Sequence, residues 1–408
     1  MKEVRSIQRD LESADSLFKA GKFARAEKIY VKILNEDPKN HRATARLGEI
    51  ALLSNLLDDA EKWLTEAIKL KPEEKAAKSL LAEVFYRRDE FQKAAPFFRS
   101  LGRESRAKQL ESFKGVSPNK IEGPEVTSLK FVITDPLPVV QIRVNNSEPV
   151  NVLIDTGGAT LIIDSEFAKE VGTVQFEAET GIFAGGKKAA VHQGKVDSVT
   201  LGDFTVKNVP VEILPTRRFS SIFGGTRMDG IIGTLLLHQF IATLDYPGGR
   251  LILRRRTEQN LKKVEKEAKE QGAIVVPFWM AGDHYMHAWG TVNESEPMLF
   301  FVDTGLAGGG FTCPESTLRR ANIKLQEDQA GEGIGGGGKV RAIPFMVNEL
   351  TLGDAKEHNI QGIFTPNTGD LERVVGFQIG GLISHGFFRP YALTFDFAKM
   401  RFFLKKKR

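Results

Sequence analysis

The chain has 408 residues, 41% of them hydrophobic and 27% charged, with a formal net charge of +5. This composition is typical of a folded globular protein and excludes wholesale disorder, and the length predicts about two to four domains. Basic residues are spread along the chain, and the tight runs at Arg254–Arg256 and Lys405–Arg408 are expected to be solvated. Because no basic stripe is present, the sequence does not indicate a nucleic-acid partner.

Cysteine content and hydropathy bear on the compartment. Cys313 is the single cysteine, so no intramolecular disulfide can form, which is typical of a reducing compartment. The N-terminal residues lack the apolar stretch of a secretory signal, and no run approaches the roughly 18 apolar residues of a membrane span. We therefore expect no membrane span and a cytoplasmic location, or a periplasmic or secreted one if a leader has been removed.

The N-terminal part of the chain is an internal repeat. Residues 7–38 and 41–72 align at a period of 34, so that Ala26 matches Ala60 and Pro38 matches Pro72. Small alanines let two helices approach closely, and the proline ends the second helix of each pair. A third copy continues over residues 81–98 without a closing proline.

This pattern resembles the tetratricopeptide repeat family. The residues that stand where that family's pattern places them are Gly21, Phe23, Ala26, Tyr30, Pro38, Leu47, Gly48, Ala60 and Pro72. The resemblance implies that residues 1–112 form an all-α stack of helical hairpins that recruits a protein partner or substrate. Generic amphipathic helices are the alternative.

The periodicity changes after a predicted linker at residues 113–125, where Gly, Pro and polar residues interrupt the helical pattern. Alternating apolar residues then predict β-strands at 139–144, 196–200, 392–397 and 401–404. The Lys/Glu-rich run 257–271 instead predicts an exposed helix. We therefore expect a mainly-β region in two halves, 126–254 and 272–408, joined by a charged helical connector at 255–271.

The two β halves are copies of one another. Val152–Gly157 corresponds to Phe300–Gly305, and each segment is an apolar strand that ends in Asp-Thr-Gly. The further matches, in the same order, are Val196–Asp203 with Val347–Asp354, Asn208 with Asn359, Ile231–Gly233 with Gln378–Gly380, and His238 with His385. Landmarks in the same order at nearly the same spacing establish a duplication, and we expect the two histidines to start or cap equivalent helices.

Two Asp-Thr-Gly triplets in duplicated β halves resemble the aspartic peptidases, in particular the bilobal pepsin-like enzymes, here with lobes as compact as a retroviral protease subunit. The resemblance implies a two-lobed fold in which Asp155 and Asp303 meet as the catalytic pair. It also implies an interlock through Thr156 and Thr304, close-packed turns at Gly157 and Gly305, and late glycines that exclude bulk at Gly233 and Gly380.

The chemistry of such a site explains the pair. Two carboxyl groups held a few ångströms apart do not both ionise, so one acts as a base and the other as an acid near neutral pH. The base takes a proton from a bridging water, which attacks the peptide carbonyl, and the acid protonates the carbonyl oxygen. This mechanism needs no metal and no cofactor. The implied function is an aspartic endopeptidase that hydrolyses peptide bonds of an extended polypeptide and, with both lobes in one chain, works as a monomer.

A glycine-rich segment lies between the triplet and the late glycine in each half. We expect these segments to form mobile hairpins over the substrate, with the flap residues Gly181, Ile182, Gly185, Gly186, Gly333, Ile334, Gly335 and Gly336. The second segment matches a G-x-G-x-x-G phosphate loop, but that motif needs a strand before it and a helix after it, which the surrounding β pattern does not offer. Neither segment contains the flap tyrosine of pepsin-like enzymes, so both are closer to the retroviral type.

The sequence departs from the family after each triplet, where Gly158 and Leu306 replace the usual Ser or Ala. The lost hydroxyl and the bulk of Leu306 are expected to raise the apparent pKa values of the pair. His284 and His287 form an H-x-x-H, but strand-like residues surround them and no acidic ligand is placed as in a zinc peptidase helix, so no metal is expected.

The alternative function is a non-catalytic scaffold, in which the peptidase-like fold binds extended peptide and the repeats supply the main interaction surface. Convergent carboxyl groups would favour the enzyme, and a splayed pair would favour the scaffold. We also expect residues 126–408 to fold as a self-sufficient peptidase without residues 1–112.

Overall fold

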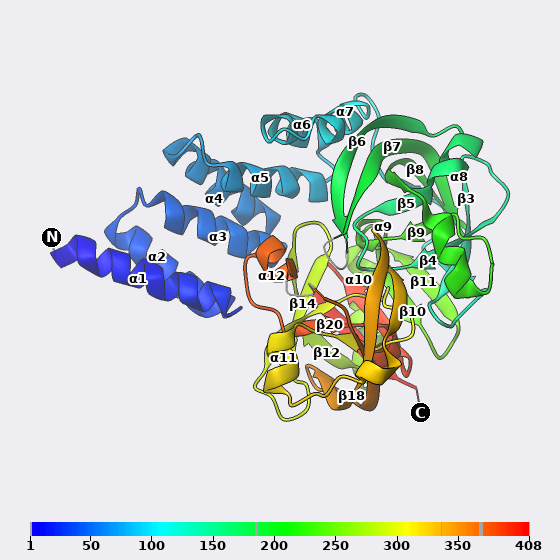
Figure 1. Ribbon diagram of the computed structural model, residues 1–408. Helices are drawn as coiled ribbons and strands as arrows, with labels where there is room; N and C mark the ends of the chain where they lie inside the picture. Colours follow the sequence, from blue (N-terminus) through cyan, green and yellow to red (C-terminus); the bar gives the residue numbers. More distant parts are fainter. Residues whose placement is uncertain (1, 184–186, 336, 367–369, 408) are drawn as a thin grey trace.

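The computed structural model describes residues 2–183, 187–335, 337–366 and 370–407. Helices stack along one side of a larger β region (Figure 1), which confirms the predicted order of all-α repeats followed by mainly-β structure. The helices are α1 (Lys2–Lys19), α2 (Phe23–Glu36), α3 (His41–Leu53), α4 (Leu57–Leu70), α5 (Lys75–Arg87), α6 (Phe91–Ser100) and α7 (Glu104–Glu111). Within the described part of the chain, no helix has the length and apolar character needed to cross a membrane.

The repeat period has a direct structural meaning. Ala26, Ala60 and Ala94 are fully buried where the two helices of each hairpin meet, because a larger side chain would push the helices apart. The turns within the hairpins fall at Gly21, Asn55 and Asp89, which have φ values of 73°, 56° and 58°. Gly, Asn and Asp are the residues that best tolerate this left-handed backbone.

Residues 113–125, predicted as a linker, are attached to the β region rather than free. Phe113 is buried, and β1 (Lys120–Glu122) pairs antiparallel with β8, with Ile121 opposite Val206. The Gly, Pro and polar residues of this segment indicated a linker. They are also compatible with a strand of only three residues at the edge of a sheet.

The first β half forms an eight-stranded sheet in the order β1-β8-β5-β9-β4-β3-β7-β6. Its elements are β3 (Val139–Val144), β4 (Val150–Ile154), β5 (Leu161–Asp164), α8 (Ser165–Glu170), β6 (Val174–Phe183), β7 (Lys187–Leu201), β8 (Phe204–Leu214), the 3-10 helix η2 (Thr216–Phe223), β9 (Gly230–Ile232) and α9 (Thr234–His238).

The second β half forms another eight-stranded sheet in the order β13-β14-β15-β20-β16-β19-β18-β17. Its elements are β13 (Trp279–Ala281), β14 (Tyr285–Gly290), β15 (Met298–Val302), β16 (Phe311–Thr312), α11 (Glu315–Arg320), η3 (Glu327–Gln329), β17 (Gly331–Gly335), β18 (Gly338–Leu352), β19 (Ala355–Phe364), α12 (Asp370–Val375), β20 (Gly381–Ile383) and α13 (His385–Phe388). The run β8-β5-β9-β4-β3 of the first half recurs as β19-β16-β20-β15-β14, which confirms the duplication.

The strand register corrects one sequence match. Ile232 lies opposite Ile154 in the parallel pair of β4 and β9, and Ile383 lies opposite Val302 in the pair of β15 and β20. Since Ile154 and Val302 each precede an Asp-Thr-Gly triplet, the residue equivalent to Gly233 is Ser384. Gly380 was therefore matched four residues too early. The match to Gly380 assumes that both halves have the same spacing between the aspartate and the late element. The spacing is 78 residues from Asp155 to Gly233 (233 − 155) and 81 residues from Asp303 to Ser384 (384 − 303).

The same shift separates the two histidines. His238 is the last residue of α9, whereas His385 is the first residue of α13. The expected equivalence of His238 and His385 is therefore wrong. Both side chains are buried, and each meets different partners: His238 lies against Arg256, and His385 against Asp135 and Arg389.

A third, six-stranded sheet joins the halves in the order β12-β22-β21-β10-β11-β2. Its strands are β2 (Val126–Lys130), β10 (Phe240–Asp245), β11 (Arg250–Arg255), β12 (Ile274–Pro277), β21 (Tyr391–Asp396) and β22 (Arg401–Lys406). The halves meet at β10 and β21, where the buried hydroxyls of Thr243 and Thr394 are 2.8 Å apart. Helix α10 (Glu258–Glu270) connects the halves as predicted, and its Val264 and Ala268 are buried against this sheet.

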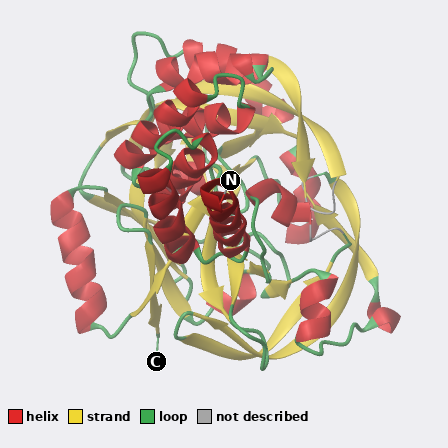
Figure 2. Ribbon diagram, turned by 90° about the vertical axis from the view of Figure 1, so that its left-hand side faces the viewer, coloured by secondary structure: helices red, strands yellow, loops and turns green. Residues whose placement is uncertain are grey.

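The repeats dock on the β region through the turns of their hairpins, and Figure 2, viewed from the repeat side, shows the helices in front of the strands. The Asn55 side chain donates to the Phe397 carbonyl oxygen at 3.0 Å. The Asn119 side chain donates to Asp89 at 2.7 Å. Buried Arg87 donates to the Met280 carbonyl oxygen at 2.8 Å. Repeats and peptidase-like halves therefore share one continuous interface.

Candidate active site

The two Asp-Thr-Gly loops occupy equivalent places at the junction of the halves. Asp155 follows β4 and Asp303 follows β15. The Asp155 N–H donates to the Ile232 carbonyl oxygen at 3.0 Å, and the Asp303 N–H donates to that of Ile383, also at 3.0 Å. Each late strand, β9 or β20, thus fixes the backbone of the aspartate beside it.

The threonine hydroxyls cross from one loop to the other. Thr156 Oγ1 accepts from the Thr304 N–H, and Thr304 Oγ1 accepts from the Thr156 N–H, both at 3.0 Å. Thr156 Oγ1 also donates to the Val302 carbonyl oxygen at 3.0 Å, and Thr304 Oγ1 to that of Ile154 at 3.4 Å. Both side chains are fully buried. Because each hydroxyl both donates and accepts across the junction, the loops are held as one rigid unit.

The glycines of the triplets bring the two carboxyl groups together. A Cβ atom added at Gly157 would lie 2.6 Å from the Asp303 carboxyl carbon, and one added at Gly305 would clash with the Asp155 carboxyl group. Any other residue would therefore force the pair apart. The two carboxyl groups are hydrogen-bonded to each other, and each also accepts from its own loop, Asp155 from the Gly157 N–H at 2.8 Å and Asp303 from the Gly305 N–H at 2.9 Å.

Burial and proximity shift the protonation of this pair. Loss of solvent raises the pKa of Asp155 well above its usual range, and the neighbouring charge of Asp303 raises it further. Burial also raises the pKa of Asp303, although the hydrogen bonds with the Gly305 N–H and with the Asp155 side chain oppose that rise. The site therefore favours a pair that holds one proton, with backbone N–H groups stabilising the ionised oxygen.

The late elements support the two loops by different groups. A Cβ atom added at Gly233 would clash with the Thr160 and Gly158 carbonyl oxygens, so the first half needs glycine there. In the second half, Ser384 instead accepts from the Leu306 N–H at 3.0 Å through its hydroxyl. Sequence analysis missed Ser384, although the run Gly381–Ser384 parallels Gly230–Gly233 and would have revealed it.

Thr234 and Gly380 also lie beside the late strands, β9 and β20. Thr234, which follows Gly233, donates to the Thr156 carbonyl oxygen at 2.9 Å, and sequence analysis missed this support as well. Gly380 has a close contact of its own, since an added Cβ atom would lie 2.7 Å from the Met298 side chain and the Phe300 ring. That contact lies before β20, away from the Asp303 loop.

The glycine-rich segments form two β-hairpins, β6–β7 and β17–β18. Gly181 lies opposite Ala189 in the first, and the second places Gly333, Ile334 and Gly335 opposite Val340, Lys339 and Gly338. Gly185, Gly186 and Gly336 lie outside the described residues, as does the side chain of Ile182. Strands rather than a helix follow the G-x-G-x-x-G match, so its geometry is not that of a phosphate loop.

The ends of the two hairpins meet each other. A Cβ atom added at Gly337, just before β18, would overlap the side chain of Lys187, the first residue of β7. The two hairpins therefore approach each other from opposite halves.

An apolar cluster extends from the Asp155 loop to the first hairpin. Its buried members come from β3 and the segment before it, from β4, β5, β7, β8 and β9, and from the region of η2, and partly buried Phe183 and Ala307 pack against them. Leu153 of this cluster lies two residues before Asp155, Ala307 lies four residues after Asp303, and Phe183 ends β6. Apolar surface therefore lies between the hairpin and both loops.

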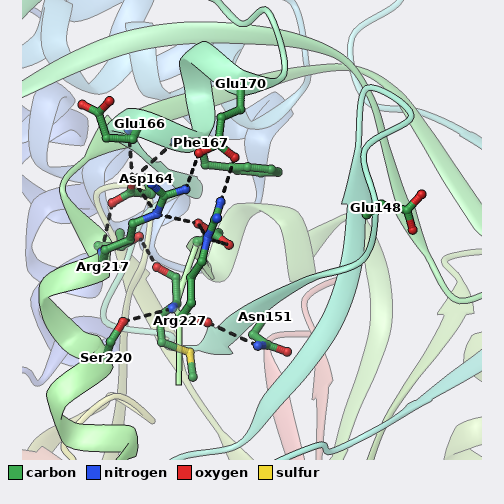
Figure 3. Close-up of polar contacts among 12 residues, drawn as sticks. Glu148, Asn151, Asp164, Glu166, Phe167, Glu170, Arg217, Ser220 and Arg227 are labelled. Carbon is green, nitrogen blue, oxygen red and sulfur yellow. Dashed lines mark hydrogen bonds and ion pairs between the residues drawn. The ribbon is translucent and has the colours of Figure 1, made fainter. Parts of the chain in front are cut away.

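A group of ion pairs holds η2, which contributes to that cluster. Arg217 donates to Asp229 at 2.9 Å, and Arg227 donates to the same carboxylate. Both arginines also donate to Glu170, each at 2.7 Å (Figure 3). Asp164 accepts from the Arg217 N–H at 2.9 Å. Buried Asp164 and Asp229 are thus neutralised by arginines that bind η2 and the following loop to the sheet.

The other candidate groups lie outside this site's chemistry. His284 contacts Asp283 at 2.6 Å, and His287 is fully buried, which lowers its pKa to about 3. Within the described residues, no three His, Cys, Asp or Glu side chains are grouped to hold a metal ion. Cys313 is buried, and burial raises the pKa of its thiol, so it is not a nucleophile.

Comparison with known protein families agrees with this geometry. The family model described as "Aspartyl protease" matches residues 140–235 and again residues 288–383. The model described as "Tetratricopeptide repeat" matches residues 17–84. No curated protein matches the chain significantly. The chain therefore combines tetratricopeptide-like repeats with a retropepsin-like aspartyl protease domain in two copies.

Proposed function

We propose that this protein is an aspartic endopeptidase in which Asp155 and Asp303 together activate a water molecule. The observation that carries the proposal is the junction itself: two partly buried carboxyl groups are hydrogen-bonded to each other, on loops held together by crossed threonine hydroxyls. A splayed pair would have favoured the non-catalytic scaffold.

The reaction follows from the raised pKa values and the geometry of the pair. The ionised carboxylate takes a proton from the water, whose oxygen bonds to the peptide carbonyl carbon, while the protonated carboxyl group donates to the carbonyl oxygen. When the tetrahedral species collapses, the C–N bond breaks and the amine leaves with a proton. The pair titrates as a unit, so either aspartate can begin as the acid.

The hairpins supply the binding surface for the substrate. Extended peptide is the form that strands bind through backbone hydrogen bonds, with alternate side chains directed to either half. The first half offers the apolar cluster around Phe183. We therefore expect the enzyme to prefer peptides with apolar side chains on that side of the cleaved bond. The repeats would recruit or position a larger protein substrate or partner.

Digestion of a peptide library between about pH 3 and pH 9, with and without a statine-type inhibitor, tests this function. Because the pKa values of both aspartates are raised, both limbs of the profile shift upward, and we expect a bell-shaped kcat/KM centred at about pH 5–7. Inhibition by the statine, which resembles the tetrahedral species, is expected. Absence of cleavage at every pH would contradict the proposal, and a rate still rising below about pH 3.5 would contradict the role given to burial.

A further inference from the structure

The two hairpins differ in what holds them from outside. Each hairpin lies at the end of its own sheet, but β6–β7 of the first half also lies against helix α7, the last helix before the β region, whereas β18 lies against η3 of its own half. Figure 1 shows α7 beside β6 and β7 at the top of the molecule. The contacts between α7 and this hairpin are both polar and specific.

The first turn of α7 binds strand β6. The Glu179 carboxylate accepts from the Arg106 backbone N–H at 3.0 Å and from the Arg103 guanidinium at 3.1 Å. An anion at a helix N-terminus is stabilised by the free N–H groups and by the helix dipole. Ser105 donates from its hydroxyl to the Glu177 carbonyl oxygen, and Lys108 pairs with the Glu177 carboxylate at 2.9 Å.

The inner face of α7 binds the next strands. Arg106 donates to Gln193 of β7 at 2.6 Å, and Gln109 donates to the Gly194 carbonyl oxygen at 2.6 Å and to that of Val211 at 3.0 Å. Arg106 and Gln109 are buried, with 3% and 0% of their surface exposed. Buried polar groups that lose their partners are costly, so this part of the contact resists opening.

The strand is irregular where α7 touches it. The register between β6 and β7 shifts between Gln175 and Ala178, so Glu177 lies in a bulge. Bulges bend a strand and change the direction of the chain beyond them. From Glu179 to Phe183 the strand extends about 13 Å at roughly 3.3 Å per residue. A small rotation at the bulge would therefore displace Phe183 from the apolar cluster.

The second hairpin has looser surroundings. Lys339 pairs with Glu332 across the hairpin at 2.8 Å, and Arg341 pairs with Glu327 at 2.8 Å. All four side chains are exposed and belong to the second half. Three of the five residues of β17 are glycine, which weakens a strand because it offers no side chain to pack.

We propose that α7 is a strap that fixes the first hairpin, and that Ser105 and Glu179 are positioning residues for the peptidase reaction. The first hairpin then keeps Phe183 in register with the Asp-Thr-Gly loops. The role in catalysis rests on the proposed peptidase function, whereas the strap itself does not.

Hydrogen exchange and kinetics of the double variant Ser105→Ala/Glu179→Ala test both parts in the full chain. Loss of these contacts is expected to accelerate amide exchange of residues 174–183 by about 10-fold and to leave residues 331–335 unchanged, because opening is local. With a peptide substrate, kcat is expected to fall about 10-fold with KM nearly constant, since misplacement of a bound substrate slows the chemical step. When Gln instead of Ala replaces Glu179, the side chain keeps an acceptor for the Arg106 N–H. Amide exchange and kcat are then both expected to return most of the way to their wild-type values.

Matched variants separate the possible results. Lys69→Ala removes an exposed Lys–Glu pair within α4 and is expected to change neither readout. Arg103→Ala/Lys108→Ala removes only exposed side chains and is expected to give a smaller shift in the same direction. Unchanged exchange in residues 174–183 would overturn the strap even in an inactive protein. Faster exchange with unchanged kcat would overturn the positioning role, and faster exchange in a protein without peptidase activity would leave the strap standing and remove the proposed function.

Discussion

Each β half carries one Asp-Thr-Gly loop. The two halves differ in how they stabilise the segment that precedes the late strand, which is β9 in the first half and β20 in the second. In the first half, arginines and buried carboxylates bind η2 to its own sheet (Figure 3). In the second half, the corresponding stretch packs on the repeats: the Phe377 ring lies 5.1 Å from that of Phe23 and 6.3 Å from that of Phe18. The geometry of the Asp-Thr-Gly loops is thus preserved, while the segments that support them from outside differ.

This difference changes one expectation from the sequence. A peptidase of residues 126–408 was expected to be self-sufficient, but Leu299, Phe377 and Ile379 share a hydrophobic cluster with helices of the repeats. Removal of residues 1–112 would expose that apolar surface. The η2 segment of the first half is supported within that half, whereas the corresponding stretch of the second half packs on the repeats.

The largest effect is expected from Phe377→Ala. The side chain is 2% exposed, and its loss leaves a cavity between the second half and the repeats, which costs about 3–5 kcal/mol of unfolding free energy. Phe18→Ala on the repeat side should be non-additive with it, because the two rings touch. Urea unfolding of both single variants and the double variant measures this coupling. Strict additivity would show that the two side chains do not support a common interface.

A smaller effect is expected from Arg217→Ala in the first half. This change removes hydrogen bonds to buried Asp229 and to Glu170, while Arg227 still pairs with both, so the expected loss is about 1–3 kcal/mol. Salt screens charges but not apolar contacts, so the loss should shrink between low and about 1 M salt. Phe377→Ala is the control, and its effect should not shrink. Equal salt responses of the two variants would contradict the proposed difference between the halves.

The Asp-Thr-Gly loops could be found from the sequence because each is a short local motif after an apolar strand. The resemblance of the two motifs to aspartic peptidases implied that Asp155 and Asp303 meet, and the 34-residue period indicated the helical hairpins. Ser384 was missed because Gly380 stands at nearly the spacing that Gly233 has from its aspartate, and the spacing alone does not show an insertion.

Long-range contacts explain the remaining differences. The pairing of β1 depends on an edge of β8 far along the chain, and three residues carry too little pattern to reveal it. A buried aromatic such as Phe377 indicates a core in the sequence, but its packing against the repeats depends on the tertiary arrangement. The ion pairs between α7 and β6 join Arg103 to Glu179 and Lys108 to Glu177, residues about 70 positions apart. Ion pairs near the surface leave no pattern in the sequence by which they could be predicted.

The smallest effect is expected from His287→Val, which gives the second half the residue that Val139 supplies in the first. Burial lowers the pKa of His287 to about 3, whereas an unfolded histidine titrates near about 6.5. Only the unfolded chain binds this proton between those values, so stability is present above about pH 6.5 and is lost as the pH falls toward 3. The variant should be less sensitive to acid, by about 1–2 kcal/mol at pH 5 relative to pH 7. Parallel urea titrations at the two pH values check this, and an unchanged acid response would show that His287 is already charged in the folded state.

The central claim is that Asp155 and Asp303 act as one catalytic unit despite their different surroundings. The most direct measurement is kcat/KM for Asp155→Asn and for Asp303→Asn on one cleavable peptide at the wild-type pH optimum, with thermal unfolding as the check on the fold. Each variant is expected to remain folded, and both are expected to lose activity alike, by at least about 10²–10⁴-fold, because the reaction needs one acid and one base. Turnover near the wild-type rate in either variant would contradict a joint catalytic role of the two aspartates.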